Sequence, residues 1–123
     1  MGFSVKARLK SFTHAFDGFT NMLRTQHNAW IHLAATVMVV AVGLALQVNA
    51  DAWRWLIAAI ALVWVAETMN TAFEHLCDVV SPELHPSVRQ SKDIAAAAVL
   101  VCVIASTLLG AITLAPYVLA ALP

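Results

Sequence analysis

Long apolar runs separated by short polar segments dominate the sequence. Three of these runs, at about residues 29–47, 52–79 and 91–114, reach the roughly 20 residues that a helix needs to cross a bilayer. Residues 3–27 show a different pattern, in which aromatic and aliphatic side chains recur at steps of three and four residues between charged and amide side chains. We therefore expect an all-α membrane protein, with an N-terminal amphipathic surface helix followed by three transmembrane helices. The pattern fits a surface helix lying in the membrane interface and one packed on the spans equally well.

The composition supports a membrane protein. Of the 123 residues, 61% are hydrophobic and only 11% are charged, whereas about 25% of the residues of an ordinary soluble domain are charged. We expect a single integral membrane domain over residues 1–123, without room for a second soluble domain. The formal net charge is zero, so no bulk charge favours nucleic acid. Cys77 and Cys102 lie at different depths of helical patterns, which argues against a disulfide framework.

The basic residues predict the orientation of the chain. Four precede the first span, one lies between the first and second, and two lie between the second and third: Lys6, Arg8, Lys10 and Arg24; Arg54; Arg89 and Lys92. Because cytoplasmic loops carry an excess of Lys and Arg, we expect the N-terminus and the loop at 79–92 to be cytoplasmic. The turn at 48–53 and the C-terminus then lie on the far side of the membrane.

The second span ends in a polar stripe. Its members are Glu67, Asn70, Glu74 and Asp78, and on a helix these positions fall within an arc of roughly 80°. Ionisable groups in a membrane helix are costly and often functional. Glu67 lies deepest and is the candidate general base, while carboxylates on such a face can bind a divalent cation. Two structural interpretations stay open, a hydrogen-bonded seam between helices and a solvated helix end, the latter explaining Asp78 better than Glu67.

The start of the third span offers a second candidate site. Lys92 can neutralise a phosphate and Asp93 can orient the lysine or a metal, although lysines also anchor spans at the interface. The five histidines show no zinc-binding spacing: His14, His27, His32, His75 and His85. His32 is notable because it faces an otherwise apolar span. The four glycines cannot form a phosphate-binding glycine loop, so these patterns alone indicate a small polytopic membrane protein with a cytoplasmic carboxylate site.

Two motifs resemble the prokaryotic diacylglycerol kinase family, which includes the undecaprenol kinases. They are Glu67-Thr-Met-Asn70-Thr-Ala-Phe-Glu74, followed by Asp78, and Ser91-Lys92-Asp93-Ile-Ala-Ala-Ala-Ala-Val99. The segments Phe12-Thr-His-Ala15-Phe-Asp-Gly18 and Asn28-Ala-Trp-Ile-His32 are also similar to the family, so the resemblance covers nearly the whole chain.

The resemblance implies a lipid kinase of the bacterial inner membrane. The γ-phosphoryl group of MgATP would pass to the hydroxyl of diacylglycerol or undecaprenol, in a homotrimer whose sites form between neighbouring subunits. Glu67 would be the base, Glu74 would hold the magnesium and Asn70 would orient the acceptor. Lys92 would contact phosphate, with support from Asp93, while Asp78 would be mainly a solvated helix end.

The N-terminal part departs from the family pattern. Gln26 and Trp30 stand where the family usually has Glu and Arg. Gln26 can ligate a metal through its carbonyl oxygen but brings no charge. Arg8 and Lys10 are the candidate phosphate contacts of the surface helix.

The acceptor and two other functions stay open at this point. The loop Ser81-Pro82-Glu83-Leu84-His85-Pro86 looks more like the polyprenol-directed branch than the enteric diacylglycerol branch. The alternatives to a kinase are an oligomeric transporter or channel subunit that uses the stripe from Glu67 to Glu74 as an ion path, and a structural scaffold. The crowding of the charges at one end of the span favours chemistry at the interface over transport.

Overall fold

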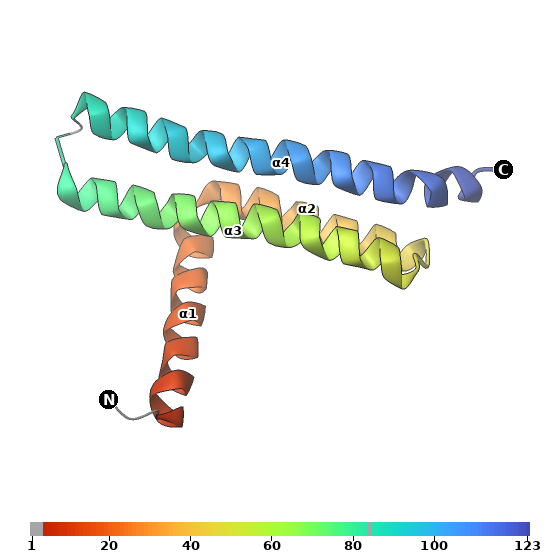
Figure 1. The fold of residues 1–123 in the computed structure, drawn as a ribbon, viewed down its shortest axis with the longest axis horizontal. Coiled ribbons are helices and arrows are strands. Elements are labelled where there is room, and N and C mark those ends of the chain that lie inside the picture. Colours follow the sequence, from red (N-terminus) through yellow and green to blue (C-terminus); the bar gives the residue numbers. More distant parts are fainter. Residues whose placement is uncertain (1–3, 84) are drawn as a thin grey trace.

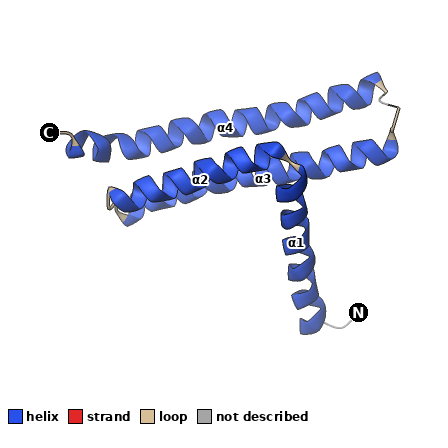
Figure 2. Cartoon of the chain, turned by 180° about the vertical axis from the view of Figure 1, so that it is seen from behind, coloured by secondary structure: helices blue, strands red, loops and turns tan. Residues whose placement is uncertain are grey.

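The described part of the chain, residues 4–83 and 85–123 of a computed structural model, is entirely helical apart from short connections (Figures 1 and 2). Its helices are α1 (Val5–Thr25), α2 (His27–Ala45), α3 (Ala50–Val80) and α4 (Pro86–Ala121). The last three are long and apolar enough to cross a membrane, which confirms the expected all-α architecture. They run side by side, whereas α1 extends away from them (Figure 1).

A single extended residue separates α1 from α2. Gln26 has φ −109° and ψ 115°, and its N–H donates to the carbonyl of Met22 at 2.9 Å. This break allows the chain to change direction sharply between two helices that are adjacent in sequence. The helix expected over 3–27 therefore ends at Thr25, and the next helix, expected from residue 29, begins at His27; residue 3 lies outside the described residues.

The turn between α2 and α3 is closed by capping and by close packing. Asn49 caps α3, its side chain accepting a hydrogen bond from the N–H of Ala52 at 2.9 Å. Gln47 takes a positive φ of 50° in this turn. Leu56 is fully buried at the centre of the adjoining apolar cluster, against which Trp53 packs.

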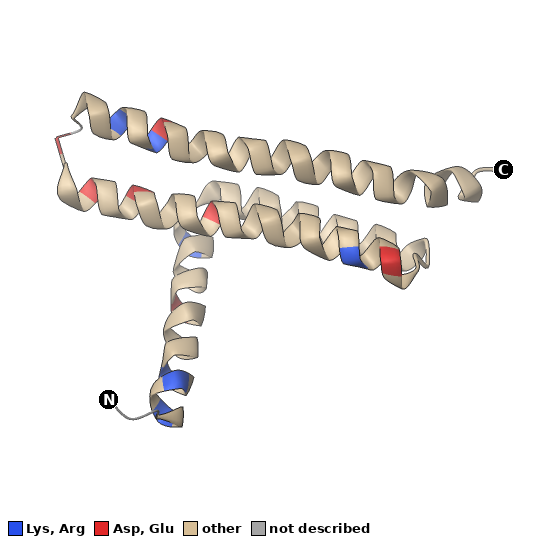
Figure 3. Cartoon of the chain, in the orientation of Figure 1, with Lys and Arg blue, Asp and Glu red and all other residues tan. Residues whose placement is uncertain are grey.

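Helix α3 has 31 residues, which corresponds to about 46 Å and exceeds a hydrocarbon core of about 30 Å. One end of α3 must therefore reach beyond the apolar layer in any orientation close to the membrane normal. Three of the four acidic side chains of α3, Glu67, Glu74 and Asp78, occupy the half of the helix that lies near the start of α4, whereas Asp51 lies in the first turn at the opposite end (Figure 3).

Helix α4 is longer at both ends than the span expected at 91–114. Pro86 does not merely bound the loop: it occupies the first turn of α4, where its missing N–H would have no helical acceptor. His85 caps this end, its Nδ1 accepting a hydrogen bond from the N–H of Ser87 at 3.2 Å. Pro116 lies inside the helix, which continues to Ala121.

The main packing interface joins α3 to α4. The hydroxyl of Ser106, which is buried, donates to the carbonyl of Ala59 at 2.9 Å. At the end of the pair that is far from the α3–α4 loop, the N–H of Asn49 donates to the Tyr117 hydroxyl at 3.3 Å. The α3–α4 pair therefore forms a hairpin that is fastened along its length, and it presents the carboxylates of α3 to the first turns of α4.

Candidate functional site

The polar stripe predicted on α3 changes from buried to exposed along the helix. Glu67 is 2% exposed, Asn70 is 9% exposed, and Asp78 is exposed. The order of depth expected from the sequence is therefore present. Glu67 is more completely buried than a boundary position requires, because α2 packs against it.

A cavity of about 250 Å³ brings three of the stripe residues together. It is lined from α2, α3 and α4 by Asn28, Ile31 and His32; Glu67, Asn70 and Glu74; and Ala96, Val99 and Leu100. Asn70 Nδ2 donates to Glu74 Oε1 at 3.2 Å. Glu67 Oε2 and Asn70 Oδ1 are buried without a hydrogen-bond partner, and such groups are costly unless they are used by a ligand. The cavity thus offers buried oxygen acceptors next to the half-buried Glu74 carboxylate.

Helix α2 contributes a histidine to this cavity. His32 Nε2 lies 3.4 Å from Glu67 Oε2, with the two side chains 12% and 2% exposed. The sequence marked His32 as unusual in an apolar span, but could not identify its partner 35 positions away. The structure supplies that partner.

Lys92 forms an ion pair across the α3–α4 hairpin. Its Nζ lies 2.8 Å from Asp78 Oδ1. Asp78 was expected to be mainly a solvated helix end, and although it is exposed, it is the residue that holds Lys92. Asp93, which lies next to Lys92 on α4, is exposed, and its supporting role stays a prediction.

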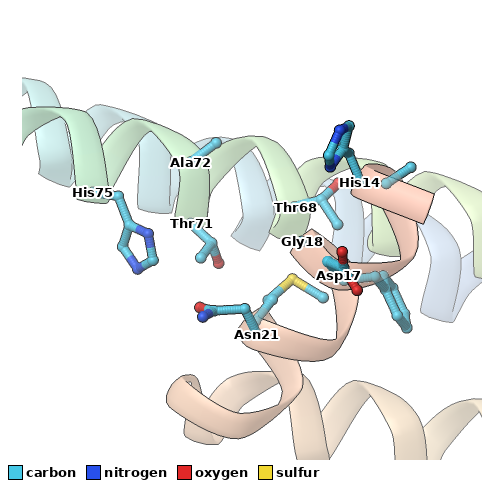
Figure 4. A pocket seen from close by; sticks show the side chains of 11 residues that line it. His14, Asp17, Gly18, Asn21, Thr68, Thr71, Ala72 and His75 are labelled. Carbon is cyan, nitrogen blue, oxygen red and sulfur yellow. The ribbon is translucent and has the colours of Figure 1, made fainter. Parts of the chain in front are cut away.

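A larger cavity of about 710 Å³ lies between α1 and α3, and the sequence analysis did not predict it. Its polar lining comes from His14, Asp17 and Asn21 on α1 and from Thr68, Thr71 and His75 on α3 (Figure 4). The sequence does contain a pattern that could have indicated this cavity: polar residues recur on one face of α1, at positions 14, 17 and 21. Thr71, whose buried hydroxyl has no hydrogen-bond partner, directly follows Asn70, so the two cavities use neighbouring faces of α3.

Comparison with known proteins decides the family. The family model described as prokaryotic diacylglycerol kinase matches residues 13–114. The chain belongs to the prokaryotic diacylglycerol kinase family. This confirms the resemblance carried by the two motifs, and it gives no support to the transporter or channel interpretation.

Curated relatives extend the match across most of the chain. The undecaprenol kinase of Bacillus subtilis (strain 168) is 33% identical over 107 residues, which cover 87% of each chain. A diacylglycerol kinase of Synechocystis is 35% identical over 109 residues, covering 88% of this chain and 62% of that protein. The diacylglycerol kinase of Escherichia coli (strain K12) is 29% identical over 105 residues, covering 74% of this chain and 86% of that protein. The family is thus one of membrane lipid kinases.

The structure does not bring the predicted N-terminal residues of this family member to the cavity. Arg8 and Lys10 are exposed on the half of α1 that lies away from the spans (Figures 1 and 3). Gln26 is half-buried at the junction of α1 and α2, and Asn28 rather than Gln26 lines the cavity. The nucleotide roles of Arg8 and Lys10 and the metal role of Gln26 therefore stay predictions.

The donor set around Glu74 fits magnesium that arrives with a nucleotide. Among residues 4–83 and 85–123, no group of three or more His, Cys, Asp or Glu side chains is placed to hold a metal by itself. Mg²⁺ in phosphoryl-transfer sites is usually held by one or two carboxylates together with the substrate phosphates. The Glu74 carboxylate and the unpartnered Asn70 Oδ1 are donors of that kind.

Proposed function

We propose that this chain transfers the γ-phosphoryl group of MgATP to the hydroxyl of a membrane lipid alcohol, diacylglycerol or undecaprenol. The observation that carries the proposal is the buried Glu67 carboxylate, which lines the same cavity as Asn70 and Glu74. A carboxylate in this position can take a proton from a hydroxyl that enters from the lipid side. Membership of a lipid kinase family supports the same reaction.

In the proposed reaction, the hydroxyl oxygen of the lipid attacks the γ-phosphorus. The new O–P bond forms while the bond from the γ-phosphorus to the bridging oxygen of ADP breaks, and the hydroxyl proton passes to Glu67. Glu74 binds the magnesium that accompanies ATP, and Asn70, hydrogen-bonded to Glu74, orients the acceptor. Phosphoryl transfer depends mainly on positioning and on charge neutralisation, which carboxylate, amide and ammonium side chains on helices can provide without a glycine-rich loop.

The remaining residues complete the nucleotide site in this proposal. Lys92, held by Asp78 at 2.8 Å, contacts the phosphates, and Asp93 supports it. Arg8, Lys10 and Gln26 do not line the cavity in a single chain, so in this proposal they act where sites are shared between subunits. There Arg8 and Lys10 would add positive charge, and Gln26 would offer a carbonyl oxygen to the magnesium. Many large apolar side chains of the spans are exposed in the single chain, for example Val37, Ile57 and Leu108. These faces fit contact with lipid or with other subunits. From the family resemblance we propose a homotrimer with shared sites in the bacterial inner membrane, and from the placement of the basic residues we propose that the N-terminus and the 79–92 loop are cytoplasmic.

The choice between diacylglycerol and undecaprenol is left to experiment, because both present a primary hydroxyl to the same catalytic groups. The Bacillus subtilis relative covers 87% of this chain and is named undecaprenol kinase, and the loop at 81–86 resembles the same branch. Relatives named diacylglycerol kinase match at similar identity. We therefore include both acceptors in one assay.

The test uses the purified full chain in mixed micelles, with Mg²⁺ and ATP labelled on the γ-phosphate. The acceptors are diacylglycerol, undecaprenol and, as a control without a free hydroxyl, triacylglycerol. The expected result is labelled lipid with at least one of the two alcohols and none with triacylglycerol. Absence of labelled lipid with both alcohols would overturn the proposal.

A further inference from the structure

His32 is held in a fixed frame by α2 and α3. Its ring meets the Trp64 ring edge-on, with centroids 6.3 Å apart and an interplanar angle of 73°. Trp64 Nε1 donates to Thr36 Oγ1 at 3.0 Å, and that hydroxyl donates to the carbonyl of His32 at 2.8 Å. The Phe19 ring of α1 also packs against Trp64, with ring centroids 5.1 Å apart and an interplanar angle of 50°. This frame restricts the direction in which the imidazole points.

The imidazole lies where the polar environment ends. His32 lines the cavity that holds Glu67, and it also lines an apolar cavity of about 130 Å³ deeper between α2, α3 and α4. The His32 side chain is only 12% exposed, and a polar group with so little access to water is stabilised by a polar partner. The partner within reach is Glu67 Oε2, 3.4 Å from Nε2. The geometry is looser than that of a hydrogen bond, since Oε2 has none in the structure, and catalytic contacts often tighten only when substrate binds.

We propose that His32 is a positioning residue for the base Glu67. The Nε2–H group of His32 donates to Oε2 of the carboxylate, which leaves Oε1 directed at the substrate hydroxyl. His32 does not touch the reacting atoms, but it determines which carboxylate oxygen receives the proton. This inference rests on the proposed lipid kinase function.

The test compares side chains that place a donor at different positions. A glutamine amide reaches the position of the histidine Nε2, an asparagine amide reaches only the position of Nδ1, and leucine has no donor. Removing a hydrogen bond to a charged group corresponds to roughly a 10- to 100-fold change. We expect His32→Leu and His32→Asn to lower kcat for lipid phosphorylation by that factor, with the KM for MgATP within about twofold of wild type, and His32→Gln to restore kcat to within about threefold.

A double variant separates positioning from a general structural role. If His32 acts only through Glu67, adding His32→Leu to Glu67→Gln leaves the residual rate of Glu67→Gln unchanged. All variants are compared for oligomer size and unfolding temperature in the same detergent, and His27→Leu, at an exposed position outside the described cavities, is the control histidine substitution.

The outcomes distinguish the two proposals. An unchanged kcat in His32→Leu, equal rates for His32→Asn and His32→Gln, or a further loss in the double variant overturns the role of His32 while leaving the kinase function standing. Absence of lipid phosphorylation by the wild-type chain overturns the kinase function and the role of His32 together.

Discussion

Lys92 of α4 is paired with Asp78 of α3, 14 positions earlier in the chain and across the loop, with Nζ and Oδ1 2.8 Å apart. The lysine side chain is 26% exposed and the aspartate side chain 60% exposed. Pairs this accessible contribute little to stability, typically below about 1 kcal/mol. We therefore expect the pair to matter for orientation: Asp78 holds the Lys92 ammonium on the side of α4 that faces α3.

Replacing Asp78 by Asn tests that role. Because an exposed ion pair is worth about 0.2–1 kcal/mol, we expect the KM for MgATP to rise by about two- to fivefold, with little change in unfolding temperature. Asp93→Asn, the neighbouring position on α4, is the comparison, measured by steady-state kinetics at saturating lipid. A KM unchanged in Asp78→Asn and raised only in Asp93→Asn would show that the sequence neighbour orients Lys92.

Gln26 tests the metal side of the site. If its carbonyl oxygen faces the magnesium, Gln26→Glu adds a negative charge to the ligand set and lowers the Mg²⁺ concentration that gives the half-maximal rate. The measurement is a magnesium titration of lipid phosphorylation at fixed ATP. His27→Glu places the same charge one residue further along, and an equal shift in that variant would show a general charge effect.

The close packing of Gly43 in α2 against Trp53 in α3 leads to a prediction about stability. A Cβ atom added to Gly43 would lie 2.9 Å from the far end of the Trp53 ring, whereas one added to Gly110 would have no neighbour within 4 Å. We expect Gly43→Ala to destabilise the protein by about 1–3 kcal/mol through overpacking, while Gly110→Ala is neutral or stabilising because alanine favours helix. Thermal unfolding in detergent checks both, and equal unfolding temperatures would contradict the packing at Trp53.

The hydrophobic pattern was sufficient to predict the helices, because each apolar run is long and the chain has few alternatives for burying its backbone in lipid. The spacing from Glu67 to Asp78 also predicted a shared face correctly, since that property depends only on helix geometry. The exact ends of the helices were harder to predict from the sequence. Pro86 begins α4, where the N–H of Ser87 donates to His85 in a capping hydrogen bond, and Pro116 lies within the helix. The hydrophobic pattern encodes neither position.

Contacts between helices could not be predicted from periodicity. The His32–Glu67 approach requires the rotation of α2 against α3, and the Lys92–Asp78 pair requires the geometry of the loop between α3 and α4. The cavity between α1 and α3 depends on the sharp turn at Gln26. Each of these is a tertiary relationship, and a single sequence gives only the candidates for it.

The rate of phosphate transfer to lipid by Glu67→Gln tests the central claim most directly. Glutamine keeps the shape of the side chain but cannot accept the hydroxyl proton, and a general base contributes about 10²–10⁴-fold. We expect a loss of at least about 100-fold with an unchanged oligomer, while Glu83→Gln, in the exposed loop, stays within about twofold of wild type. Full activity in Glu67→Gln would contradict the assignment of Glu67 as the base.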